Sequence, residues 1–103
     1  MKEKIISSFD KAKIYYITSG NLKRTPVIFL HGITGNRTTW HYQARYLEKK
    51  KIPFIIFELR GHGKSQAKFS KGFIEDSIRD VLYVLSREKV KKAMGKRAKL
   101  YSF

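Results

Sequence analysis

The pattern of apolar and polar positions in the first half of the chain predicts four strands of two kinds. Residues 5–9 and Lys13–Thr18 mix Ile, Phe, Tyr and Thr with polar residues and are separated by a short polar turn, so they predict an antiparallel pair at a sheet edge. Val27–Leu30 and Phe54–Phe57 are instead continuous apolar runs. Runs of this kind are typical of strands that are buried on both faces of a parallel sheet.

Two amphipathic helices are predicted, one between the two apolar runs and one after them. Residues 38–51 place Trp40, Ala44 and Leu47 on one helical stripe, which makes a strand–helix–strand unit. Residues 74–85 have helical apolar spacing, and the predicted buried face consists of Ile74, Ile78, Val81, Leu82 and Leu85. Together these elements predict an α/β fold, with an antiparallel edge hairpin followed by a parallel βαβ unit and two helices.

The alternation of strands and helices breaks after Val90. An α/β protein would continue with another buried strand, but residues 91–103 are too rich in lysine and arginine for a central strand. We therefore expect the N-terminal part of an α/β domain over residues 1–90, and a basic tail over residues 91–103.

Composition adds a strong positive charge. Lysine and arginine total 23 against 8 acidic residues, a net charge of +15. Such a balance promotes non-specific attraction to nucleic acid but specifies no fold or function. The chain contains no cysteine, which excludes disulfides, thiolate metal sites and a cysteine nucleophile. No apolar run approaches the roughly 20 residues that span a bilayer, so no membrane span is predicted and we expect a soluble, cytoplasmic protein.

Two loops that follow the apolar runs carry the most informative residues. Residues 31–36 read His-Gly-Ile-Thr-Gly-Asn, and residues 58–65 read Glu-Leu-Arg-Gly-His-Gly-Lys-Ser. Together and in this order they resemble the α/β-hydrolase family, whose third strand ends in a His-Gly loop and whose fourth ends in an Asp-x-Arg-Gly-x-Gly-x-Ser loop. Trp40 and Asp80 also match the family pattern, and the resemblance runs over residues 9–90.

The resemblance implies a role for each loop. In acyl transfer, negative charge develops on the carbonyl oxygen, and preorganised main-chain N–H groups stabilise it. The family supplies one such N–H from the first loop, and the matching residue here is Ile33, in a loop that begins with His31 and Gly32. The second loop is expected to form a structural turn, made by Arg60, Gly61, His62 and Gly63. Glu58 stands where the family has aspartate.

The family's nucleophile has no counterpart in the chain. Its serine lies in a G-x-S-x-G turn after the next strand, with the acid and the histidine later still. The nearest pentapeptide, residues 63–67, precedes the second helix and lacks the final glycine, so Ser65 is not expected to be a nucleophile. The resemblance therefore implies a truncated hydrolase with no catalytic residues, inactive alone, and no metal or cofactor.

The full-length relative that the resemblance implies is a serine ester hydrolase of the esterase or lipase type. Epoxide hydrolases, dehalogenases and haloperoxidases share the two loops, so the substrate class stays open. Residues 63–65 also spell the end of a P-loop, but Glu58 stands where that motif needs glycine, and its carboxylate would repel phosphate. The alternative function is a basic protein that associates with nucleic acid without catalysis, in a salt-dependent and sequence-blind way.

The resemblance also predicts partners. In the family's strand order the fifth strand lies beside the third, so the outer edge of Val27–Leu30 is expected to be unpaired here. Exposed apolar edges recruit other chains. We therefore expect self-association or binding to a complementary C-terminal half, and a small-molecule ester substrate only for a full-length relative.

Overall fold

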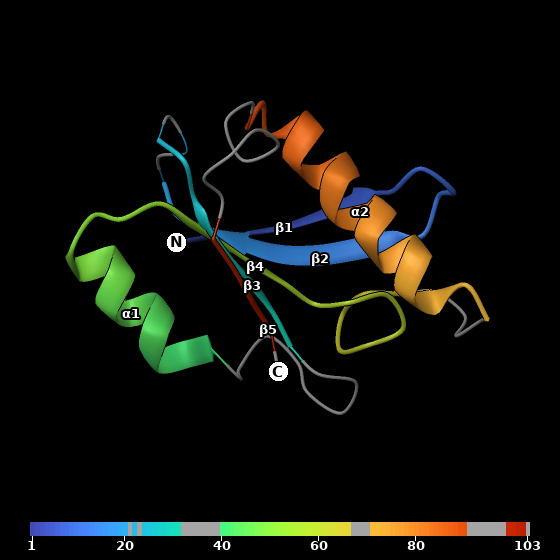
Figure 1. Ribbon diagram of the computed structural model, residues 1–103, viewed down its shortest axis with the longest axis horizontal. Coiled ribbons are helices and arrows are strands. Elements are labelled where there is room, and N and C mark those ends of the chain that lie inside the picture. The colour runs from blue at the N-terminus through green and yellow to red at the C-terminus, as the bar shows by residue number, and fades with distance from the viewer. Residues whose placement is uncertain (21, 23, 32–39, 67–70, 91–98, 103) are drawn as a thin grey trace.

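The computed structural model contains a five-stranded mixed sheet with helices on both faces (Figure 1). It describes residues 1–20, 22, 24–31, 40–66 and 71–90, and the main chain of 99–102. In chain order the described elements are β1 (Lys2–Ser7), β2 (Lys13–Thr18), β3 (Val27–Leu30), α1 (His41–Lys49), β4 (Phe54–Phe57), α2 (Phe73–Arg87) and β5 (Lys99–Ser102).

The strands lie in the order β1-β2-β4-β3-β5 across the sheet. β1 pairs antiparallel with β2 and β2 antiparallel with β4, whereas β3 pairs parallel with both β4 and β5. The predicted edge hairpin and parallel βαβ unit are therefore confirmed. β1 ends earlier than predicted because Ser8 and Lys11 belong to the hairpin turn. There the Ser8 N–H donates to the Ala12 carbonyl over 2.8 Å, and the Lys11 N–H donates to the Ser8 carbonyl over 3.0 Å.

Each face of the sheet has its own apolar core because β3 and β4 send alternate side chains to opposite sides. The core beneath α2 contains Ile14, Tyr16, Ile28, Ile55, Phe57, Val81, Val84, Leu85 and Val90. The core beneath α1 contains Phe29, Trp40, Ala44, Phe54 and Ile56. All four residues of β4 are buried, as its continuous apolar run predicted.

The face that α2 turns toward the sheet differs from the predicted one. The buried residues of α2 are Phe73, Ser77, Asp80, Val81, Val84 and Leu85. Ile74, Ile78 and Leu82, which were predicted to be buried, are 67%, 56% and 44% exposed. The helix is rotated because buried Asp80 lies on the sheet side, where its carboxylate accepts hydrogen bonds from Arg60. A polar contact therefore outweighs the burial of the larger apolar side chains.

The chain after α2 also departs from expectation. We expected no further strand, yet β5 pairs in parallel with β3, with Val27 opposite Lys99 and Leu30 opposite Ser102. The expectation that the outer edge of β3 is unpaired is therefore wrong. Strand pairing uses main-chain N–H and C=O groups, so an edge strand does not need the apolar composition of a central one. Residues 91–98, which the predicted basic tail includes, lie outside the described residues.

A polar cluster fastens the end of α2 to the hairpin. Glu88, which caps α2, accepts hydrogen bonds from Lys4 Nζ at 2.7 Å and from the Tyr16 hydroxyl at 2.5 Å. Burial raises the pKa of the Glu88 carboxyl, but the hydrogen bonds from Lys4 and Tyr16 outweigh it and hold that pKa below its ordinary value of 4.5. A lowered carboxyl pKa stabilises the fold above about pH 4.5, and this contribution is lost as the pH falls through the folded-state pKa.

The variant Glu88→Gln should lower the free energy of unfolding at neutral pH by about 1–2 kcal/mol, because hydrogen bonds to a charged acceptor are lost. Its stability should also fall less than that of the wild type between about pH 6 and pH 3. Urea unfolding followed by circular dichroism at several pH values measures both effects. Glu75→Gln, which removes an exposed carboxylate from the same helix, is the matched control and should keep the wild-type pH dependence. Equal acid sensitivity of the Glu88→Gln protein and the wild type would contradict the assignment.

Candidate functional site

The candidate site lies at the carboxyl ends of β3 and β4. The two strands are parallel, with Leu30 opposite Phe57, so the loops that leave them emerge at the same edge of the sheet. His31 is the first residue after β3, and Glu58 is the first after β4. In parallel α/β sheets this edge is where ligands bind. The topology therefore brings the start of the His-Gly loop beside the second loop.

His31 joins the two loops. Its side chain is 2% exposed, and its Nε2 atom accepts a hydrogen bond from the main-chain N–H of Leu59 over 2.9 Å. The ring also packs against His62, with ring centroids 4.9 Å apart, and His62 in turn lies 5.7 Å from the ring of Phe73. Because Nε2 accepts a hydrogen bond from a main-chain N–H, that atom carries no proton. His31 therefore positions the two loops relative to each other.

Arg60, Gly61, His62 and Gly63 lie in a tight turn. The His62 N–H donates to the Leu59 carbonyl over 3.0 Å, and the Ser65 N–H donates to the His62 carbonyl over 2.8 Å. The His62 Nδ1 atom lies 3.0 Å from the Arg60 carbonyl oxygen, within hydrogen-bond distance. The main chain has positive φ angles at Gly61 (77°) and Gly63 (50°). These are the conformations that glycine adopts most readily.

Glu58 fills the space inside this turn. Glu58 is fully buried, and its Oε1 atom accepts a hydrogen bond from the Lys64 N–H over 2.7 Å. A Cβ atom at Gly63 would overlap the Glu58 carboxylate. Glycine is therefore needed at position 63 both for its φ angle and for space. The glutamate that departs from the family's aspartate is accommodated as part of the turn.

Ser65 is a structural residue in this arrangement. Its side chain is 3% exposed, its hydroxyl donates to the Glu58 carbonyl over 2.5 Å, and it accepts from the Tyr15 N–H over 2.8 Å. Both partners are main-chain groups, one in β2 (Tyr15) and one directly after β4 (Glu58). The hydroxyl therefore links the end of the second loop to β2 and β4.

Arg60 forms a buried clamp that sequence reasoning missed. Its side chain is 4% exposed, and its guanidinium donates to both carboxylate oxygens of Asp80, from Nε over 2.7 Å and from Nη2 over 2.8 Å. It also donates to both oxygens of Asp10, over 3.0 and 3.1 Å, and lies 3.4 Å from Asp76. The Ser8 hydroxyl donates to Asp80 over 2.5 Å. The clamp therefore fixes the second loop to α2 and to the β1–β2 turn.

The clamp also shifts two protonation equilibria. Hydrogen bonds to Asp80, and then to Asp10, raise the pKa of Arg60 still further above its already high value, so the guanidinium stays charged although it is buried. The hydrogen bond from Arg60 likewise lowers the pKa of the Asp10 carboxyl. The sequence carries one signal for this cluster, since the loop that contains Arg60 and the helix that contains Asp80 both match the family pattern. Only the fold shows that Asp10, Asp76 and Asp80 gather on Arg60.

The predicted oxyanion residue is not placed. Gly32 and Ile33 lie outside the described residues, so the N–H of Ile33 stays a prediction. His31, which precedes them, is placed at the edge where that prediction requires the loop to begin. His41, the third histidine of the chain, is exposed at the start of α1.

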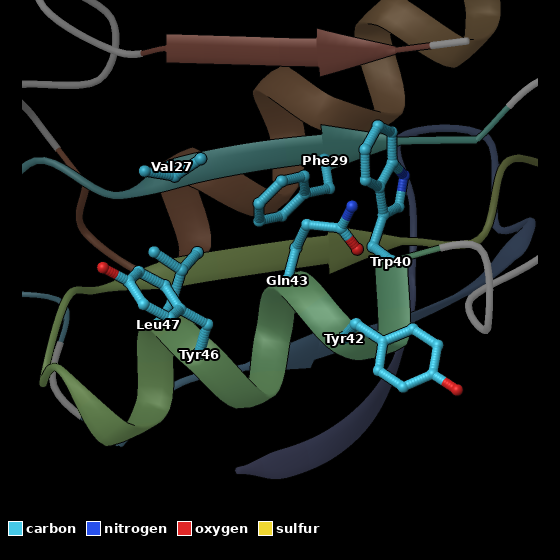
Figure 2. A pocket seen from close by; sticks show the side chains of 7 residues that line it. All are labelled: Val27, Phe29, Trp40, Tyr42, Gln43, Tyr46 and Leu47. Carbon is cyan, nitrogen blue, oxygen red and sulfur yellow. The ribbon is translucent and has the colours of Figure 1, made fainter.

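A second feature, which the sequence did not predict, is an apolar groove of about 540 Å³ between α1 and β3. Figure 2 shows Val27 and Phe29 on β3 facing the side chains that α1 contributes. Trp40 stands at the start of the helix, and its ring packs against Phe29 with centroids 4.9 Å apart. The groove is lined by Val27, Phe29, Trp40, Tyr42, Gln43, Tyr46 and Leu47.

The part of the chain that the structure describes holds neither a cluster of metal ligands nor a membrane-spanning helix. Nowhere in it do three or more His, Cys, Asp or Glu side chains come together so that they could hold a metal ion. Neither described helix has the length and apolar character to cross a membrane.

Known proteins resemble this chain in sequence and in fold. A family model described as "alpha/beta hydrolase fold" matches residues 25–95. The chain is 39% identical over 70 residues to the "Probable proline iminopeptidase" of Leptolyngbya boryana, covering 66% of this chain and 22% of that protein. It is 36% identical over 67 residues to the "AB hydrolase superfamily protein YisY" of Bacillus subtilis (strain 168), covering 61% of this chain and 25% of that protein.

A solved structure agrees with these matches. The chain superposes on a thermophilic esterase from Thermogutta terrifontis with a TM-score of 0.78 and 20% identity, covering 100% of this chain and 36% of the esterase. At that identity the likeness concerns the fold alone. The chain thus spans about a quarter of the curated relatives' length and about a third of the esterase. The family model covers more than half of the chain, so this protein belongs to the α/β-hydrolase fold family.

Proposed function

We propose that this chain carries the oxyanion-hole side of a serine ester hydrolase site of the esterase or lipase type, and that the 103 residues have no hydrolase activity of their own. The observation that carries the proposal is the hydrogen bond from the Leu59 N–H to His31 Nε2, over 2.9 Å. It holds the start of the His-Gly loop against the second loop at the carboxyl ends of two parallel strands.

The proposed chemistry is acyl transfer. The N–H of Ile33, two residues beyond His31, would stabilise the negative charge on the tetrahedral intermediate. The buried side chains of Arg60 and His31 would act on this N–H only through the main chain, by holding the two loops in place. A preorganised donor of this kind lowers the barrier only where a nucleophile generates the oxyanion.

A nucleophile is what the 103 residues lack. Their sequence contains no G-x-S-x-G pentapeptide. Ser65 is buried and both donates and accepts a hydrogen bond with main-chain groups, so activation by a histidine would first require these bonds to break. The serine, the acid and the histidine of a complete site would therefore come from a segment outside these residues.

The names of the relatives suggest a reaction type for the proposed site but not a single substrate class. The names of the curated and solved relatives include an iminopeptidase and an esterase, which cleave different bonds through the same kind of acyl intermediate. We propose an ester because the chain superposes over its whole length on an esterase. A peptide substrate is the alternative within the same chemistry.

The purified chain should be catalytically silent. Hydrolysis of p-nitrophenyl butyrate and of proline p-nitroanilide should equal the rate in buffer, and a fluorophosphonate probe should leave the protein unlabelled, because no activated serine is present. Mass spectrometry after labelling gives the stoichiometry. Ser65→Ala is the control. Stoichiometric labelling of the wild type that this variant abolishes would show that Ser65 is a nucleophile and that the proposal is wrong.

A further inference from the structure

Aromatic and basic side chains are interleaved on the side of α1 that faces away from the sheet. They stand at positions i, i+3, i+4, i+7 and i+8, the spacing that brings side chains onto one side of a helix. The five residues are Tyr42, Arg45, Tyr46, Lys49 and Lys50, the last of which directly follows the helix. All five are exposed, Tyr42 by 82% and Tyr46 by 58%. We call this surface the α1 outer face.

The charge of the α1 outer face is positive without compensation inside the face. It holds three cations and no acidic residue. Glu48, the acidic residue of α1, lies off this face and forms an ion pair with the N-terminal ammonium of Met1 over 2.6 Å. The exposed side of α2 differs, because it places Glu75 beside Arg79. The α1 outer face is therefore a place where the net charge of +15 is concentrated locally.

The two tyrosines present aromatic rings next to these cations. Lys50 Nζ lies 5.9 Å from the centroid of the Tyr46 ring, within cation–π distance, and Tyr46 remains largely exposed with that lysine in place. Figure 2 shows the Tyr42 side chain directed away from β3. Four residues of helix separate the rings by about 6 Å along its axis. Both tyrosines also line the groove between α1 and β3, so the surface is hollowed beside them.

An anionic membrane and a nucleic acid would both be attracted by such a face. A helix that binds at a membrane surface turns an apolar side to the lipid. The apolar side of α1 is instead packed on the sheet, where Trp40 is 6% and Ala44 3% exposed. A nucleic acid offers partners for both kinds of side chain, phosphates for the cations and base faces for the tyrosines. Only single strands have base faces free to stack, because in a duplex the bases stack on one another.

We propose that the α1 outer face binds single-stranded nucleic acid, with bases stacked on the two tyrosines and phosphates paired with the three cations. The binding is separate from the proposed hydrolase function, since it uses none of the residues at the carboxyl ends of β3 and β4. It also differs from attraction by net charge alone. Net charge acts on any polyanion, whereas stacking on Tyr42 and Tyr46 needs unstacked bases.

The tyrosines are tested with a labelled oligothymidine of about 20 nucleotides, longer than one expected site, and with duplex DNA of the same length. Fluorescence anisotropy during titration with the full chain gives the dissociation constants. Tyr42→Ala and Tyr46→Ala should each weaken binding to the single strand roughly fivefold or more, because a stacked base is lost. Duplex binding should change less than about twofold. Tyr46→Phe keeps the ring and should bind like the wild type, as should Ile78→Ala, which removes a 56% exposed side chain from α2.

The cations are tested by the salt dependence of binding to the same oligothymidine. Replacing all three cations of the α1 outer face by glutamine should lower the slope of log K against log salt by about 2, because each phosphate contact to a single strand contributes about 0.7. A matched triple variant removes the same charge from exposed positions on and beside α2, and its slope should change by less than about half as much. The matched substitutions are Lys71→Gln, Arg87→Gln and Lys89→Gln.

Four results would overturn the proposal. They are no complex with oligothymidine at low salt, equal effects of the two triple variants, no loss of single-strand binding with either alanine variant, and equal loss for single strand and duplex. Vesicles of phosphatidylserine and phosphatidylcholine form a further arm, and sedimentation with vesicles that Tyr42→Ala and Tyr46→Ala abolish would assign the face to a membrane instead. Every substituted side chain is exposed, so the variants should fold, which circular dichroism checks.

Discussion

Replacing Arg60 by leucine should lower the free energy of unfolding by about 3–5 kcal/mol, because it leaves the Asp80 carboxylate buried without its charged partner. Asp80 and Arg60 are each 3% exposed, so water does not reach the carboxylate to compensate. Whole domains are stable by only about 5–15 kcal/mol, so the variant should be close to unfolding at room temperature. Urea unfolding followed by circular dichroism measures the loss.

Two further variants show whether burial sets the size of the effect. Asp10→Asn removes the other bidentate partner of the same guanidinium, but the Asp10 side chain is 40% exposed, so the loss should be about 1 kcal/mol or less. Arg60→Lys keeps the positive charge but loses the bidentate hydrogen bonding. Its loss of unfolding free energy should lie between those of Arg60→Leu and Asp10→Asn. Similar losses for Arg60→Leu and Asp10→Asn would contradict the claim that the buried Asp80 contact dominates.

The central strands could be predicted to the residue, whereas the exposed face of α2 could not. Val27–Leu30 and Phe54–Phe57 are continuous apolar runs, and burial on both faces leaves them no other place in an α/β fold. The face of α2 was misjudged because counting apolar residues ignores polar contacts made at long range. Asp80 bonds to Arg60, 20 positions away, and this contact turns Ile78 toward solvent.

The loops of the candidate site could be predicted from the sequence, but the contacts that hold them in place could not. The residue types after β3 and β4 identified His31 and the turn at 60–63 as the important positions, and parallel pairing places them at one edge. That the clamp would recruit Asp10, 50 positions from Arg60, cannot be read from spacing. β5 was missed for a related reason, since edge pairing is made by the main chain and leaves little trace in side-chain composition.

Gly63→Ala should lower the free energy of unfolding by about 2.5–5 kcal/mol, for two separable reasons. The φ angle of 50° costs an alanine roughly 1–2 kcal/mol. The new methyl group also overlaps the Glu58 carboxylate, which must move and give up the hydrogen bond that it accepts from the Lys64 N–H, at a cost of about 1.5–3 kcal/mol. Thermal and urea unfolding of the purified variant give the total.

A matched glycine and a double variant separate the two contributions. Gly20→Ala is the control, because a Cβ atom at Gly20 meets nothing within 4 Å, and its effect should stay within about 0.5 kcal/mol. In a Glu58→Ala background the overlap is gone, so Gly63→Ala should then cost only the roughly 1–2 kcal/mol of the positive φ angle. If Gly63→Ala costs the same with Glu58 present and absent, the carboxylate does not fill the turn, and glycine is required at position 63 for its main-chain conformation alone.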